Sequence, residues 1–401
     1  MSALKYWLWL SAAEGLGPNA KAAVIREYGD PERAFMAADS ELSNIKGLNA
    51  KDAEILEKRD ISRVYEIEEA CAGGNISIIS MDDSSYPERL RNIYAPPPVI
   101  YVKGRIKDFD ELPSVAVIGT RRASQYGLKM GRDIARQICV CGGTVISMLG
   151  PGIDTEAARG ALLAGGKCIG VLGTAHEETH GSIINDIVSC GALVSEYAPG
   201  TKSYRSFFRD RNRIASGLSL GVVVVEAPEK SGTRLFASEA AEQGKEIFAV
   251  PGNADAPGCA GSNALIREGA GLVTCGADVM QEFEALFPEK IHITRIPAGP
   301  AAENPVRTDK NTDNSRIIQR KDIDNKKSRG YIDLREQLSA LSAEQLEIIT
   351  AIDKNSEHID DIIENTGLPA AKVLSQLTLL EIKGYIKRKP GRRYILNTAE
   401  K

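Results

Sequence analysis

Between residues 114 and 287, short runs of β-branched and other apolar residues alternate with alanine-rich segments of helical spacing. The apolar runs have no polar face, which is typical of strands that helices bury on both sides. Parallel strands need long crossovers, and the intervening segments, such as residues 128–140 and 155–164, have the periodicity of helices. The alternation therefore predicts an α/β fold with a doubly wound parallel sheet. The expected strands are residues 114–118, 144–146, 168–172, 192–194, 221–225, 246–250 and 272–273.

The rest of the chain divides by composition into further parts. Residues 1–74 show short helical periodicities broken by glycines, which predicts a small helical domain of the SAM or helix–hairpin–helix kind. Residues 75–288 hold an extended, proline-rich, edge-like entry and then the α/β core, whereas residues 289–338 have the polar composition of a linker. Residues 339–401 show three short helical patterns followed by a hairpin, the pattern of a winged helix.

The two tryptophans give a finer expectation for the first domain. Trp7 and Trp9 are two residues apart and cannot share one helical face. We expect one of them in the core of this domain and the other in an interdomain contact.

Composition limits the compartment and the partners. The 50 basic and 54 acidic residues give a net charge of −4, which excludes a uniformly basic, histone-like protein but not a local basic site. No apolar run approaches the roughly 18–20 residues of a membrane span, and the run from Tyr6 to Leu10 is too short for a signal peptide. The seven cysteines form no CxxC pair, which fits a reducing compartment. We expect a cytoplasmic protein with no membrane partner.

The loop after the first parallel strand has the character of a phosphate site. Ligands of doubly wound sheets bind at the carboxyl ends of the strands. Here the loop is Gly119-Thr120-Arg121-Arg122, and arginines occupy the space in which a dinucleotide fingerprint needs glycines. A helix N-terminus attracts anions, and arginine adds bidentate phosphate contacts. The loop therefore favours a phosphate-bearing ligand over NAD, with a structural ion pair as the alternative.

Two further loops strengthen this interpretation. Residues 202–213 hold five cations, one acid and three aromatic residues, and such interleaving is typical of surfaces that bind single-stranded nucleic acid. The alternative is a solvated loop with one phenylalanine in the core. Another loop at a strand end offers a cation and small polar groups. The candidate residues of these two loops are Lys202, Arg205, Phe208, Arg211, Arg213, Lys230, Ser231 and Gly232.

Catalytic and metal motifs are weak. His176-Glu-Glu-Thr-His180 matches the HExxH pattern, which binds zinc only when a helix brings both histidines to one face. The segment instead follows a strand end and runs into Gly181. No Walker lysine, nucleophile elbow or convincing Cys/His pair is present, so we expect no metal, no cofactor and no enzymatic activity.

The chain resembles the DNA-processing protein A family (DprA, also called Smf) from roughly Ile79 to Phe283. Several long strings in the right order carry the resemblance, which is more specific than any single motif. Among them are Gly119-Thr-Arg-Arg-Ala-Ser-Gln-Tyr-Gly127, Gly152-Ile-Asp154, Ser195-Glu-Tyr197, Arg211-Asn-Arg213, Glu226-Ala-Pro-Glu-Lys-Ser-Gly232 and Phe248-Ala-Val-Pro-Gly252.

The resemblance implies an extended Rossmann-like core that binds single-stranded DNA, forms a homodimer and helps to load the RecA recombinase during natural transformation. By motif position, Arg121 would hold a phosphate, Arg205 would stand at a basic position of the family, and Phe208 would stack on a base. Lys230 and Ser231 would line the same pocket. For Arg211 and Arg213, DNA contact and structural ion pairing both remain open.

The chain also departs from the family pattern. Met148 stands where the family usually has a glycine, and Pro151 where it usually has an arginine that a phosphate pocket could use. The segment 176–180 replaces a usual Tyr-Pro, and Arg209-Asp210 stands where proline and a basic residue are common.

Two other functions are possible. One is a nucleotide sensor or enzyme related to the phosphoribohydrolases, although residues 230–239 lack the glycine-rich loop of that group. The other is a winged helix that binds duplex DNA through the basic residues of its hairpin. These residues are Lys387, Arg388, Lys389, Arg392 and Arg393.

Overall fold

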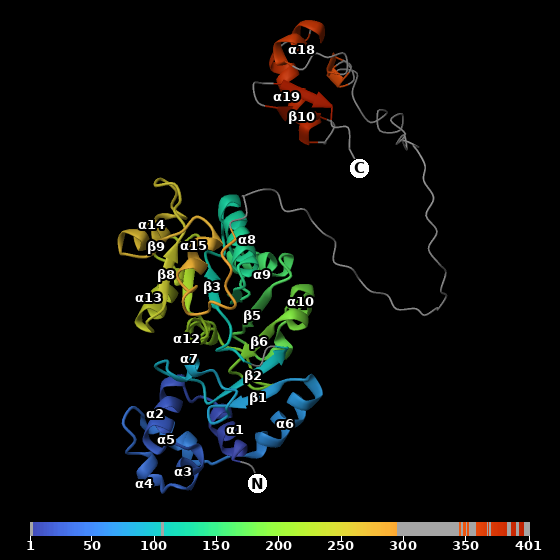
Figure 1. Cartoon of the computed structure of the whole chain (residues 1–401). Helices are drawn as coiled ribbons and strands as arrows, with labels where there is room; N and C mark the ends of the chain where they lie inside the picture. The colour runs from blue at the N-terminus through green and yellow to red at the C-terminus, as the bar shows by residue number, and fades with distance from the viewer. Residues whose placement is uncertain are drawn as a thin grey trace, which may run out of the picture. The chain divides into compact units, whose positions relative to one another are not determined.

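The chain forms two compact units, residues 1–307 and 308–401, which we describe separately (Figure 1). The computed structural model describes residues 3–105, 108–294, 345, 348–349, 351–352, 358–366, 368, 370–382, 386–389 and 393–396. Within these ranges, every helix is too short or too polar to cross a bilayer.

A nine-stranded sheet with the order β1-β2-β6-β5-β4-β3-β7-β8-β9 organises the first unit. Every pair from β6 across to β9 is parallel, as in the registers Val115↔Val145 and Val117↔Val223. The prediction of a doubly wound parallel sheet is confirmed, with each strand within one residue of its expected bounds. The parallel strands are β3 (Ser114–Ile118), β4 (Thr144–Ser147), β5 (Lys167–Val171), β6 (Ala192–Ser195), β7 (Gly221–Val224), β8 (Glu246–Ala249) and β9 (Gly271–Leu272).

The proline-rich entry extends one edge of this sheet. Strand β1 (Ser77–Ser80) pairs antiparallel with β2 (Val99–Gly104), and β2 pairs antiparallel with β6. The expected extended, edge-like path is confirmed.

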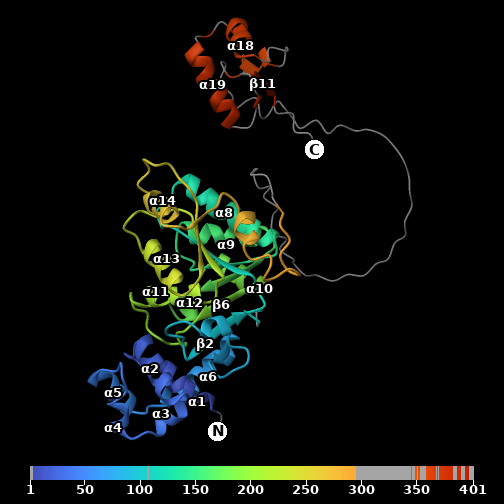
Figure 2. The ribbon, with the colours of Figure 1, turned by 60° about the vertical axis from the view of Figure 1, so that its left-hand side comes forward.

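Helices cover both faces of the sheet (Figure 2). Because side chains alternate along a strand, Val115 and Val117 face one layer, and Ala116 and Ile118 face the other. Helices α8 (Gln125–Val140), α9 (Ile153–Leu163), α10 (Ser182–Cys190) and α15 (Gly276–Gln281) pack on the first face. Helices α7 (Glu88–Arg91), α12 (Asn212–Gly217) and α13 (Gly232–Glu242) pack on the second, and Leu265 of α14 (Ala260–Arg267) joins them there.

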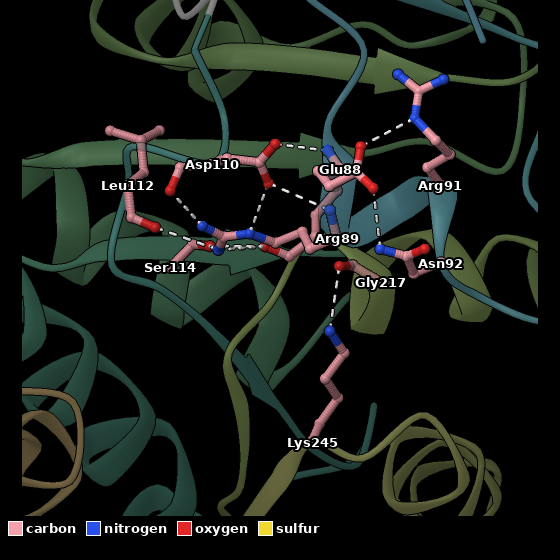
Figure 3. Close-up of polar contacts among 10 residues, drawn as sticks. Glu88, Arg89, Arg91, Asn92, Asp110, Leu112, Ser114, Gly217 and Lys245 are labelled. Atoms are coloured by element: carbon pink, nitrogen blue, oxygen red, sulfur yellow. Dashed lines mark hydrogen bonds and ion pairs between the residues drawn. The ribbon is translucent and has the colours of Figure 1, made fainter. Parts of the chain in front are cut away.

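A polar network ties α7 to the amino end of β3 (Figure 3). The Arg89 guanidinium donates to Asp110 Oδ1 at 3.0 Å, to Ser114 Oγ at 3.0 Å and to the Leu112 carbonyl at 3.2 Å. Lys245 Nζ donates to the Gly217 carbonyl nearby, and burial lowers the pKa of Lys245 to about 8. These contacts stabilise the edge of the sheet at which β3 begins, opposite the loops that follow the parallel strands.

Six short helices form the N-terminal part of this unit: α1 (Leu4–Ala12), α2 (Pro18–Tyr28), α3 (Pro31–Met36), α4 (Asp39–Leu42), α5 (Ala50–Glu57) and α6 (Ser62–Gly74). Trp9 packs in their own core, whereas Trp7 packs against α6 and against Val99 and Tyr101 of β2. The different positions expected for the two tryptophans are confirmed. The apolar run from Tyr6 to Leu10 is a buried part of α1.

The second unit shows two of the three helices and the hairpin expected of a winged helix, and residues 343, 344, 346, 347 and 350 of the first expected helix lie outside the described residues. Helices α18 (Ile359–Thr366) and α19 (Ala370–Ile382) pack around Ile362, Val373 and Leu377. Strands β10 (Ile386–Lys389) and β11 (Arg393–Leu396) form the expected antiparallel hairpin. Arg392 and all but the first six residues of the expected linker, 289–338, lie outside the described residues.

Candidate nucleic-acid interface

The candidate loops meet where the sheet reverses its order. From β3 the chain moves through β4 and β5 to β6, and it then returns to the other side of β3 with β7. The crevice of a doubly wound sheet opens at such a reversal. The loops that follow β3 and β7 lie side by side here, because the Thr120 amide donates to the Glu226 carbonyl at 2.8 Å.

Glu226 organises the loop after β3, a role that the sequence analysis missed. Its buried carboxylate accepts from the Ser124 amide at 2.9 Å and from the Ser124 hydroxyl, while Ser124 Oγ accepts from the Gly127 amide at the start of α8. A Cβ on Gly127 would lie 2.4 Å from this carboxylate, so the position requires glycine. The Glu226 carboxylate therefore occupies part of the site at the N-terminus of α8 where we expected a phosphate to bind.

The arginines of this loop remain available to a ligand. Arg121 and Arg122 are exposed, and neither forms an ion pair with any residue that the structure describes. A phosphate at this edge would therefore bind the guanidinium groups rather than the amides that begin α8.

The loop after β4 packs directly beneath Arg121. Gly152 has a φ of 88°, and a Cβ there would lie 2.5 Å from the Thr120 carbonyl oxygen and 2.8 Å from that of Arg121. Asp154, which follows it in α9, is buried and accepts from the Gly119 amide at 3.3 Å. Burial raises the pKa of Asp154 to about 7, although Arg211 and Arg121 oppose the shift.

Arg211 is part of the frame beneath the surface. Its side chain is buried and donates from Nη1 to the carbonyls of Met148 at 2.6 Å and Val171 at 3.3 Å. It thereby ties the loop after β4 to the end of β5. Its guanidinium lies 5.7 Å from the centre of the Phe208 ring, and burial lowers the pKa of Arg211 to about 10.

Arg213 forms an ion pair with Glu196, and the two side chains are 15% and 9% exposed. Of the two roles left open for Arg211 and Arg213, this geometry fits a structural one for both.

Phe208 presents a supported ring to solvent. It lies on α11 (Phe207–Asp210), and 40% of its surface is exposed. The ring packs closely on Gly173, because a Cβ added to that glycine would lie 2.9 Å from Phe208 Cδ1. Its neighbour Phe207 stacks on Tyr197 with ring centres 3.9 Å apart. Helix α11 therefore packs at the ends of β4 and β5 and leaves part of the Phe208 side chain exposed to solvent.

The remaining candidates lie in the loop between β6 and α11 and in the loop between β7 and α13. Lys202, Arg205 and Lys230 are exposed, and the described part of the chain offers none of them an ion pair. Ser231 is instead the N-cap of α13, since its Oγ accepts from the Arg234 amide at 3.3 Å, and Gly232 begins that helix. We call the exposed set, Arg121, Arg122, Lys202, Arg205, Phe208 and Lys230, the strand-end surface.

The HExxH segment is not an α-helix. His176–Glu178 forms a single 3-10 turn, and the buried His176 lies with Nε2 2.9 Å from the Tyr101 carbonyl oxygen. Burial lowers the pKa of His176. Among the residues with described positions, no three potential ligands are arranged to hold a metal ion.

Two family models match the chain. DNA recombination-mediator protein A matches residues 77–284, which is more than half of the chain, and the DprA winged helix domain matches residues 334–392. The chain belongs to the DprA family.

Individual relatives agree with this result. Protein Smf of Synechocystis sp. is 30% identical over 402 residues, which cover 97% of this chain and 98% of the relative. DNA processing protein DprA of Streptococcus pneumoniae is 38% identical over 209 residues, 51% of this chain and 73% of that protein. The X-ray structure of the Streptococcus pneumoniae DprA superposes with a TM-score of 0.59 at 31% identity, covering 70% of this chain and 98% of that one. The predicted family, its α/β core with a winged helix, and its class of DNA-processing recombination mediators are confirmed.

Two of the departures from the DprA pattern, Met148 and Pro151, lie in the loop after β4. Met148 contributes its carbonyl to the bond with Arg211, and a residue with a side chain can do this as well as glycine. Pro151 is exposed immediately before Gly152, so the place of the usual arginine is on the surface beside Arg121.

Proposed function

We propose that this chain is a cytoplasmic, homodimeric mediator that binds single-stranded DNA on the strand-end surface and loads RecA in natural transformation. The observation that carries the proposal concerns the segments that follow the carboxyl ends of β3, β6 and β7. They hold the half-exposed ring of Phe208 and five exposed cations that form no ion pair with any residue the structure describes. Guanidinium and ammonium groups bind phosphates, and a supported aromatic ring binds an unstacked base.

The Phe208 ring favours single strands over duplexes. Bases of a duplex are already stacked on their neighbours, whereas a base of a single strand can lie flat on an aromatic side chain. The cations follow the backbone and carry no sequence information. The expected ligand is therefore any flexible single strand, with affinity that falls steeply as salt rises.

The proposals that this chain loads a recombinase and forms a homodimer rest on its membership of the DprA family. The matching model describes a recombination mediator, and mediators deliver single-stranded DNA to a recombinase. A homodimer would place two strand-end surfaces on one DNA strand and raise its effective affinity.

Fluorescence anisotropy with labelled oligo(dT), titrated across salt, tests the DNA-binding part. We expect tight, salt-sensitive binding that a duplex of equal length displaces poorly. Arg121→Ala and Lys230→Ala should each weaken binding and flatten the salt dependence, whereas Arg26→Ala, an exposed arginine on α2, serves as the control. Unchanged affinity in both variants would contradict the assigned surface, and RecA loading is the assay that follows.

The winged helix is a second candidate site, for duplex DNA. Lys387 and Arg393 are exposed on the two strands of its hairpin, where Lys387 pairs with Ile395 and Arg393 with Lys389. The double variant Lys387→Ala/Arg393→Ala in the full chain should then lose duplex binding and keep its affinity for oligo(dT). Duplex binding at the level of the unaltered chain would exclude this role for the hairpin.

A further inference from the structure

A cavity of about 500 Å³ lies beside α11, outside the strand-end surface. It opens where the N-terminal helices meet the sheet unit, and cavities at such junctions are preferred ligand sites. Its lining includes Tyr94, Arg209, Asp210, Glu239 and Glu242. The cavity adjoins the strand-end surface, because Arg209 is the next residue after Phe208 on the same short helix.

The lining combines a stacking surface with hydrogen-bond acceptors. Tyr94 is 74% exposed and follows α7 in a loop, so its ring is open to a planar ligand. Asp210, Glu239 and Glu242 bring three carboxylates to the cavity, and Glu239 Oε2 accepts from the Asn212 side chain at 3.5 Å. Burial together with neighbouring acids raises the pKa of Asp210 and that of Glu239. Arg209 is exposed and forms no ion pair within the described ranges.

Carboxylates in such a lining distinguish bases by their exocyclic groups. A carboxylate accepts from the amino group of cytosine, adenine or guanine, but it meets a carbonyl oxygen at the corresponding edge of uracil or thymine. An acidic lining also repels phosphates, so the sugar–phosphate chain has to remain outside, beside Arg209, while only a base enters.

We propose that the cavity binds one nucleobase with an exocyclic amino group, from a nucleotide adjacent to the one stacked on Phe208. Tyr94 stacks on this base, Glu239 accepts from its amino group, and Arg209 holds the phosphate between the two nucleotides. The inference rests on the proposed function, since it extends the path of the same strand. It adds a base preference to a surface that otherwise reads only the backbone.

The test compares oligo(dC) with oligo(dU) of equal length by anisotropy, with the full-length protein. These oligonucleotides differ at the base edge, chiefly in the exchange of an amino group for a carbonyl. Mildly alkaline buffer keeps oligo(dC) unfolded and Glu239 ionised. The unaltered protein should bind oligo(dC) about five-fold more tightly or better, and Glu239→Gln and Tyr94→Ala should each bring this affinity ratio close to one.

Matched controls separate the cavity from general effects. Glu284→Gln and Tyr65→Ala change exposed residues of the same types that do not line the cavity, and both should retain the ratio. Equal binding of oligo(dC) and oligo(dU) by the unaltered protein would overturn the inference and leave the proposed function intact. A preference that persists in both cavity variants would also overturn it. Absence of binding to either oligonucleotide would refute the proposed function and this inference together.

Discussion

Replacing Phe208 with alanine should weaken single-stranded DNA binding without changing its salt dependence. The side chain is 40% exposed, and its inner side rests on Gly173 and above the Arg211 guanidinium. Stacking of one base on such a ring contributes about 1–3 kcal/mol, which corresponds to roughly a 5- to 150-fold loss of affinity. Because the ring carries no charge, the slope of log affinity against log salt should stay the same.

The same change has a cost in stability that must be measured separately. About half of the ring is buried, so its removal should lower the free energy of unfolding by about 1–2 kcal/mol. Urea unfolding followed by circular dichroism gives this value and shows that the variant is folded where binding is measured. Phe208→Tyr is the matched control, because it keeps a stacking ring and should bind nearly as well as the unaltered chain.

Two results would refute the reasoning on Phe208. If folded Phe208→Ala binds oligo(dT) with unchanged affinity, no base stacks on this ring. If its affinity falls together with the salt slope, the substitution has displaced the cations, and the loss cannot be assigned to stacking.

Four further changes test other parts of the site. Arg121→Ala should lower the magnitude of the salt slope by about 0.7, the contribution of one phosphate contact on a single strand; an unchanged slope would remove Arg121 from the surface. Pro151→Arg, which restores a cation beside Arg121, should raise affinity for oligo(dT) and steepen the slope by a similar amount, and anisotropy would show neither effect if the position faces away from the DNA. Arg213→Ala should destabilise the fold by about 3 kcal/mol or more, because it leaves the buried carboxylate of Glu196 without its partner, and a loss below about 1 kcal/mol in urea unfolding would contradict this structural role. Between about pH 4 and pH 7, the native state holds a proton on Asp154 that the unfolded chain has released, so the free energy of unfolding falls as pH rises. Asp154→Asn removes this titration and should make the fall smaller. Urea unfolding of both proteins at several pH values should therefore show a flatter profile for the variant.

The strands could be predicted from the sequence because a buried strand is marked by a run of neighbouring apolar residues. The buried runs at residues 114–118 and 221–224 have no polar face, and only burial on both sides by helices accommodates that pattern. The predicted strand bounds were therefore correct to within a residue. The exposed cations Arg121, Arg205 and Lys230 were also identified from the sequence, since charge clusters at strand ends are visible in the order of residues.

Tertiary structure decided which charged residues are available to a ligand. Arg205, Arg211 and Arg213 belong to one cluster in the sequence, yet Arg205 is exposed while Arg211 holds two carbonyls and Arg213 pairs with Glu196. Their partners lie at Met148, Val171 and Glu196, on three other segments, and no local pattern reveals such contacts. The same reason explains Glu226, which follows β7 and whose carboxylate accepts from Ser124, 102 residues earlier in the sequence.

The cavity beside α11 is the feature that the sequence alone predicts least. It is assembled from α2, the loop after α7, and helices α11 to α13, so its lining residues are spread from Asn19 to Gln243. Sequence determines which chemical groups the chain carries and where its strands and helices form, because these depend on neighbouring residues. Packing of distant segments decides which groups are neutralised, which are buried and which face a ligand, because burial and pairing are properties of the folded chain alone.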